Sequence, residues 1–226
     1  MRKVNYLIML IVCLSFVQCK SNEDKANELI DEYMFNRLYD YESYQPIETN
    51  IDSAFHTIYN DSTAISYAKD ILFHAQKLID MDEARHKRLG LSSWRFMYAY
   101  KPLSTLSIHP INWADSVNAF YVANATQHLI SLYDTIDNEF IGWEVTHKFR
   151  CKSKGGYYDI SHYVFLIDKD FKTILSTMDL EDEDVRKVFS TISECVLYSY
   201  LEEDRTEIKE ILHGLQGIKT KYLSSD

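Results

Sequence analysis

The amino-acid sequence predicts an α+β fold, in which N-terminal helices pack on a small antiparallel sheet and C-terminal helices follow. Two observations support this fold class. Apolar residues first recur at helical spacing, in three segments between residues 23 and 132, and then alternate with charged or polar residues from Trp143 to Cys151. A Gly155-Gly156 pair follows the alternating segment and predicts the turn of a β-hairpin.

The first 18 residues have the pattern of a secretory signal peptide. Met1-Arg2-Lys3 is positively charged, and an apolar run of about a dozen residues extends from Tyr6 to Val17. A membrane-spanning helix needs about 20 apolar residues, so the length favours a cleaved signal. Cys19 ends the run, which resembles a lipobox whose cysteine becomes the acylated first residue. We therefore expect lipidation of Cys19; the alternatives are an uncleaved anchor and a chance cysteine.

Removal of residues 1–18 leaves 19–226, which we expect to form one α+β domain after a short polar tether at about 19–24. The removed segment carries two positive charges and no negative ones, so the formal net charge falls from −10 to −12. Such an acidic chain argues against nucleic acid as a partner and against electrostatic attachment to anionic lipid. Export permits a disulfide between Cys151 and Cys195, but we favour two buried free thiols.

The apolar spacing predicts helices over residues 23–39, about 60–90, 117–132, from about 181, and 207–215. Residues 91–112, which contain two prolines, are expected to form a connector. Tyr44-Gln-Pro46-Ile-Glu-Thr49 is expected to be extended, because the residue before a proline avoids the α region. The hairpin should occupy about 140–167, and a third strand should follow at about 172–178.

The pairing of the hairpin follows from its turn. We expect a two-residue loop at Gly155-Gly156, which would place Phe149 opposite His162. This register collects the apolar residues on one face, which would hold Trp143, Val145, His147, Phe149, Ile160, His162, Val164 and Leu166. The other face would hold the charged residues, with Lys152 opposite Asp159.

His147 and His162 would lie diagonally on the apolar face, within reach of each other. One interpretation is a metal-binding or acid–base pair inside a pocket. The other is a pair of core histidines, each hydrogen-bonded to a backbone carbonyl or a tyrosine. We favour the second, because a metal site needs a third ligand that we cannot place. No phosphate-binding or nucleophile-elbow motif occurs, so we expect no catalytic residue, no cofactor and no metal.

The outward face of the hairpin is expected to carry Lys148, Arg150 and Lys152 beside Tyr163. These residues could bind an acidic partner, or a glycan that stacks on tyrosine. An exposed sheet face that is protected by its charges needs no partner, and we favour this simpler interpretation.

Three segments, Ser43–Phe55, Gly142–Gly156 and Tyr163–Asp170, resemble those of small exported lipoproteins typical of Bacteroidetes. The resemblance implies the same order of lipobox, helices and late hairpin over most of the mature chain. It supports export and lipidation, and it implies no catalytic residue.

We therefore expect a lipid-anchored protein of the bacterial cell envelope, held at the outer membrane and not an enzyme. It would bind or support a protein or glycan partner. One alternative is an immunity-type lipoprotein, whose acidic charge would suit a basic toxin. Another is an uncharacterised enzyme that uses His147 and His162.

Overall fold

The computed structural model describes residues 20–89, 102–107 and 113–200. The chain divides into two compact units, one made of residues up to Ala54 with Gly142–Met178, the other of Phe55–Ile141 with residues from Asp179 onward. We call them the sheet unit and the helical unit. Each has its own hydrophobic core, whereas the sequence predicts one domain for 19–226. Cys19 and the helix expected at 207–215 lie outside the described residues.

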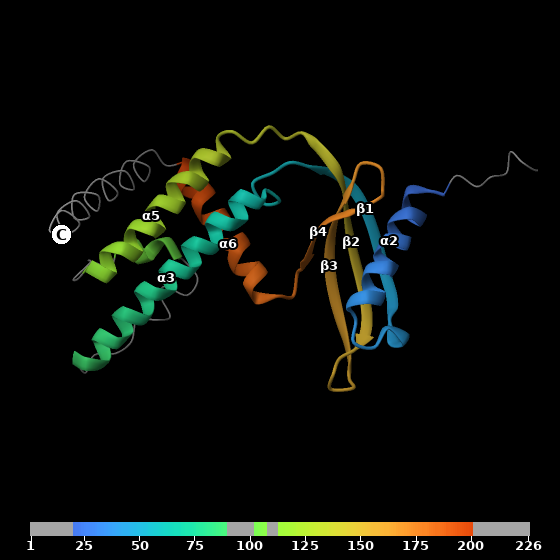
Figure 1. The fold of residues 1–226 in the computed structure, drawn as a ribbon, viewed down its shortest axis with the longest axis horizontal. Coiled ribbons are helices and arrows are strands. Elements are labelled where there is room, and N and C mark those ends of the chain that lie inside the picture. The colour runs from blue at the N-terminus through green and yellow to red at the C-terminus, as the bar shows by residue number, and fades with distance from the viewer. Residues whose placement is uncertain (1–19, 90–101, 108–112, 201–226) are drawn as a thin grey trace, which may run out of the picture. The chain divides into compact units, whose positions relative to one another are not determined.

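The sheet unit packs one helix on a four-stranded antiparallel sheet (Figure 1). Its elements are α2 (Asn22–Arg37), the 3-10 helix η1 (Tyr41–Ser43), β1 (Gln45–Phe55), β2 (Phe140–Lys152), β3 (Tyr158–Asp168) and β4 (Ile174–Asp179). The strands are neighbours in the order β1-β2-β3-β4. The α+β class and the antiparallel sheet with its late hairpin are confirmed. β1 is an additional strand, where only an extended segment at 44–49 was expected.

α2 begins with a capping box. The Ser21 hydroxyl oxygen accepts a hydrogen bond from the Asp24 N–H (3.1 Å), and the Asp24 carboxylate accepts one from the Ser21 N–H (3.0 Å). These two bonds satisfy backbone donors that have no partner inside the helix. The tether expected at 19–24 is therefore shorter than predicted, because Asn22 to Asp24 form the first turn of α2.

The core of the sheet unit lies between α2 and one face of the sheet. Every fourth residue of α2 is buried there, as helical spacing requires: Ala26, Ile30 and Met34. The sheet and the β3–β4 turn contribute Val145, Phe149, Phe165, Ile167 and Phe171. At the far end of β2, the Lys152 N–H donates to the Ser43 hydroxyl (2.8 Å), which joins the hairpin to η1.

The pairing of β2 with β3 differs from the predicted register by one residue. Val145 lies opposite Phe165, and Phe149 lies opposite Ser161 rather than His162. The loop contains three residues, because the Ser153 N–H donates to the Tyr157 carbonyl (2.9 Å). The Gly156 N–H donates to the Ser153 carbonyl (2.9 Å), and Gly156 has a φ of 80°. A tight turn followed by a left-handed residue is a common three-residue hairpin loop.

A shift of one residue moves every β3 side chain to the opposite face of the sheet. The core face therefore receives Tyr163, Phe165 and Ile167, and His162 lies on the outward face. The alternation of the sequence could not distinguish the two registers, because all four residues from Val164 to Ile167 are apolar and buried.

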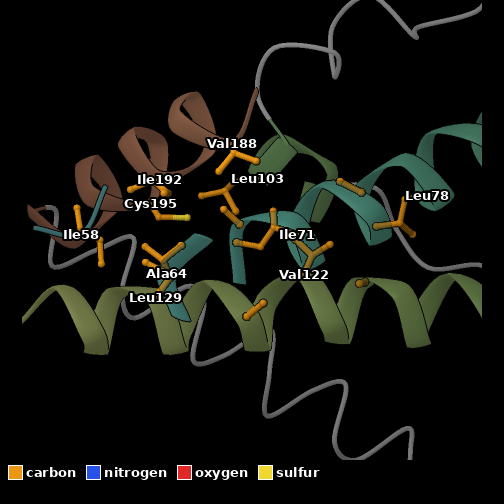
Figure 2. Close-up of a cluster of buried hydrophobic side chains, with 14 residues drawn as sticks. Ile58, Ala64, Ile71, Leu78, Leu103, Val122, Leu129, Val188, Ile192 and Cys195 are labelled. Carbon is orange, nitrogen blue, oxygen red and sulfur yellow. The ribbon is translucent and has the colours of Figure 1, made fainter. Parts of the chain in front are cut away.

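The helical unit contains α3 (Ser62–Leu89), the 3-10 helix η2 (Pro102–Ser107), α5 (Trp113–Tyr133) and α6 (Glu183–Tyr200). Figure 2 shows its core side chains gathered between these helices, among them Ile71, Leu103, Val122 and Ile192. The apolar stripe predicted for α3 is buried, including Ala64, Ala68, Ile71, Ala75, Leu78 and Ile79. The buried residues of α3 and α5 share this core with those of α6.

Within the described residues, no helix is both long enough and apolar enough to cross a bilayer. Cys151 and Cys195 are free thiols. They belong to the hydrophobic clusters of different units: Cys195 is a buried member of the helical core, and Cys151 packs against the sheet core.

Candidate functional site

His147 is a buried histidine whose ring is fully occupied by internal hydrogen bonds. Its side chain lies on the core face of β2, and the residue is 1% exposed. Nε2 lies 2.7 Å from the Tyr44 hydroxyl, and Nδ1 lies 2.9 Å from the Thr49 hydroxyl. A neutral imidazole has one donor and one acceptor, and both are used here. Burial lowers the pKa of His147 to about 4, so the ring is neutral at physiological pH.

The structure does not bring His147 and His162 together. His147 lies opposite Tyr163, and His162 lies opposite Lys148 on the other face of the sheet. The predicted histidine pair is wrong because the three-residue loop shifts the register. Among the described residues, no group of three or more His, Cys, Asp or Glu side chains could hold a metal ion.

Three cations lie at alternate positions of β2, on the outward face. Lys148, Arg150 and Lys152 are paired across the hairpin with His162, Ile160 and Tyr158 respectively. We call these six residues the basic strand face. Two predicted details are wrong: Tyr163 lies on the core face, and Asp159 pairs with Cys151 instead of Lys152. Sequence reasoning missed Tyr158 as the aromatic member of this face, again because of the register.

Two cations of the basic strand face, Arg150 and Lys152, are held in position by their neighbours. The Arg150 Nε–H donates to the Gln45 side-chain oxygen (3.1 Å), and a terminal guanidinium nitrogen of Arg150 bonds to the same oxygen. The Arg150 guanidinium carbon lies 5.1 Å from the centroid of the Tyr158 ring, and the Lys152 ammonium lies 5.5 Å from it. Such cation–π contacts restrict long, flexible side chains to a few conformations.

The three β2 cations of this face lie in a segment without acidic residues. Residues 145–158 include four cations and no acidic residue, in a chain of net charge −10. In the described parts of the chain, Lys148, Arg150 and Lys152 form no ion pair within 4.0 Å. Tyr158 and Ile160 are 48% and 58% exposed beside them. The face therefore combines unpaired positive charge with accessible apolar surface.

The helical unit carries stacked histidine–tyrosine pairs between α3 and α5. The rings of His74 and Tyr121 stack at 4.4 Å, and those of Tyr67 and His128 stack at 5.3 Å. The Nδ1 atom of His74 lies 2.8 Å from the Asn118 side-chain oxygen. Each pair takes one ring from each helix, so these contacts fasten the two helices together.

A charged cluster joins the same two helices. Arg85 lies 2.6 Å from the carboxylate of Asp115 and 3.2 Å from that of Asp82. His86 also contacts Asp82, at 3.2 Å. The Asp115 side chain is 1% exposed, and a carboxylate so deeply buried requires a cation beside it. We interpret the cluster as a structural network.

His56 links the start of the helical unit to the segment after α5. Its Nε2 lies 3.1 Å from the Asp61 carboxylate, and its Nδ1 lies 3.1 Å from the Asp137 carboxylate. The hydrogen bonds to Asp61 and Asp137 raise the pKa of His56. The backbone of the same segment is also joined, since the His56 N–H donates to the Glu139 carbonyl (2.7 Å).

Comparisons with protein-family models, curated proteins and solved structures found no match for this chain. No binding or catalytic residue can therefore be transferred from another protein. Of the arrangements described above, the histidine and carboxylate clusters have their charged groups paired within the fold. The basic strand face differs because its cations point outward and, within the described part of the chain, form no ion pair within 4.0 Å.

Proposed function

We propose that this protein is a lipid-anchored protein of the bacterial envelope that binds an acidic partner through the basic strand face. One observation supports the binding role above the others. Lys148, Arg150 and Lys152 lie on one outward sheet face beside exposed apolar side chains, and among the described residues they form no ion pair within 4.0 Å. A face of this kind attracts and orients a partner of opposite charge.

The positive charge of this face contrasts with the net charge of the chain. The whole chain has a net charge of −10, so an acidic partner is repelled on average. The cluster of cations on β2 provides a local region that attracts such a partner. Because Gln45 and Tyr158 already position Arg150 and Lys152, binding orders fewer side chains and costs less entropy.

The state of His147 also supports binding over catalysis. Both of its ring nitrogens are occupied inside the core, and its lowered pKa keeps it neutral. A general base must reach a proton on a substrate. An imidazole bonded to Tyr44 and Thr49 at 1% exposure does not offer that access.

Lipid anchoring is tested with the variant Cys19→Ala. We expect wild-type protein to incorporate a labelled fatty acid and to sediment with membranes, and the variant to do neither. Treatment of intact cells with a non-permeant protease then shows which side of the membrane the protein faces. If the variant remains in the membrane as firmly as wild type, the lipid-anchor proposal is wrong.

Partner binding is tested by photo-crosslinking in cells. A photoreactive amino acid replaces Ile160, which is 58% exposed on the basic strand face, or Phe73, which is 59% exposed on α3. We expect a discrete adduct from position 160 that disappears when Lys148, Arg150 and Lys152 are changed to Gln. The matched control changes three exposed lysines of α3 to Gln: Lys69, Lys77 and Lys87.

The proposal predicts that the α3 triple variant keeps the adduct of wild type. It also predicts no adduct of the same mass from position 73. An adduct from position 160 that persists in the β2 triple variant would show that charge at this face does not hold the partner.

A further inference from the structure

We propose that the acidic partner presents an extended peptide segment with carboxylates at alternate positions, aligned with the cations of β2. This inference rests on the binding function proposed above and specifies the chemistry of the partner. It depends on the spacing of the cations and on the exposed side chains of Tyr158 and Ile160 beside them. It also depends on the cation–π contacts that Tyr158 already makes.

The spacing of the cations is that of a β-strand. Lys148, Arg150 and Lys152 are two residues apart, so successive side chains are separated by about 6.6–6.8 Å along β2. An extended peptide has the same repeat, and its alternate side chains point to one side. Three carboxylates at positions i, i+2 and i+4 can therefore meet three cations at once, over a length of about 13 Å.

The row of β3 residues beside the cations suits a peptide more than a uniformly charged polymer. Tyr158 and Ile160 lie on the neighbouring strand, about 4.8 Å away, and expose about half of their surface. The aliphatic parts of a peptide lying over β2 can cover these two side chains. Burial of their apolar surface would add to the attraction between charges.

Tyr158 also disfavours a sugar chain as the occupant. Stacking of a sugar ring needs an open aromatic face. Arg150 and Lys152 both lie over the Tyr158 ring, within 5.1 and 5.5 Å of its centroid. The carboxylates of an anionic glycan are, in addition, spaced by its repeating sugars and not by a strand repeat.

The test uses two labelled peptides of identical composition and the full-length chain purified in detergent. The alternating peptide is Ser-Glu-Ser-Glu-Ser-Glu-Ser, and the block peptide is Ser-Ser-Glu-Glu-Glu-Ser-Ser. In an extended block peptide, adjacent carboxylates point to opposite sides, so fewer of them face the protein. One exposed ion pair contributes little, so we expect the alternating peptide to bind about two- to fivefold more tightly. An oligogalacturonate of equal charge serves as the glycan probe.

The β2 triple variant and the α3 triple variant are titrated in the same way, after circular dichroism has shown that both are folded. Loss of binding by the β2 variant alone places the peptide on the basic strand face. Equal affinities for the two peptides, or tighter binding of the glycan, would overturn the strand-matching inference and leave an acidic-partner function in place. If none of the three probes binds, the inference fails, and the crosslink from position 160 decides separately whether the proposed function survives.

Discussion

The hydroxyl of Tyr44 lies 2.7 Å from Nε2 of His147, and this contact ties the segment before β1 to the centre of β2. Burial raises the pKa of Tyr44 and lowers the pKa of His147, so both groups are neutral over the physiological range. Thr49 occupies the other ring nitrogen. A histidine placed in this way holds a sheet together and does not titrate near neutral pH.

Replacement of Tyr44 by Phe should destabilise the sheet unit. The change keeps the aromatic ring and removes the partner of Nε2, and an unsatisfied buried polar atom costs about 1–3 kcal/mol. The measurement is the free energy of unfolding in urea, followed by hydrogen exchange of peptides from β2. Tyr39→Phe is the matched control, because Tyr39 is 73% exposed, and its effect should stay within about 0.5 kcal/mol.

The lowered pKa of His147 makes stability depend on pH in one direction. The pKa is about 4 in the folded protein and about 6.5 in an unfolded chain, so the unfolded chain binds more protons between these values. The contribution of His147 is therefore complete above pH 6.5 and is lost as the pH falls toward 4. We expect His147→Gln to flatten this part of the profile for β2 exchange. A variant profile as steep as that of wild type would contradict the assignment.

His56 should make the stability of the helical unit depend on pH in the opposite direction. Its pKa is raised mainly by the hydrogen bond to Asp61 and, to a smaller extent, by the hydrogen bond to Asp137. The stabilisation is complete below about pH 6.5, which is the pKa of a histidine in an unfolded chain. It disappears as the pH rises through the higher pKa of His56 in the folded protein. Exchange at the start of α3 should therefore become faster as the pH rises through this range, after correction for intrinsic exchange rates. His56→Gln should remove this dependence and leave the β2 profile unchanged.

Gly142 should not tolerate a side chain. Its φ is 155°, and a Cβ atom at this position would lie 2.1 Å from the carbonyl oxygen of Ile167 on the partner strand. Gly142→Ala should therefore cost more than about 2 kcal/mol of folding free energy. Gly155→Ala is the control, since the nearest atom to its Cβ is 3.5 Å away, in ordinary contact. Urea midpoints of the two variants, measured against wild type, provide the test.

The long helices were predictable because each is stabilised by the burial of one apolar face. The buried positions of α3 follow its apolar residues, which repeat at helical spacing from Ala64 to Ile79. β1 could not be identified as a strand, because most of its residues are exposed and its sequence shows no alternation. The hydrogen-bonding partner expected for a core histidine was found for His147, in Tyr44.

The candidate site was predictable only in part, for a different reason. Lys148, Arg150 and Lys152 were placed on one outward face because β2 alternates clearly. Their neighbours on β3 depended on the loop, and one additional loop residue exchanged Tyr163 for Tyr158. Hydrogen bonds that span 98 residues or more, such as those of His147 to Thr49 and Tyr44, leave no local pattern in a sequence.

The capping box at Ser21 limits how far the sheet unit can reach. Three peptide bonds connect Cys19 to Asn22, where α2 begins, and a fully extended chain of that length spans at most about 10 Å. The 16 residues of α2 add about 24 Å. If Cys19 is acylated as proposed, the end of α2 stays within roughly 35 Å of the lipid. The short connection would then give the sheet unit a high effective concentration for partners close to the membrane.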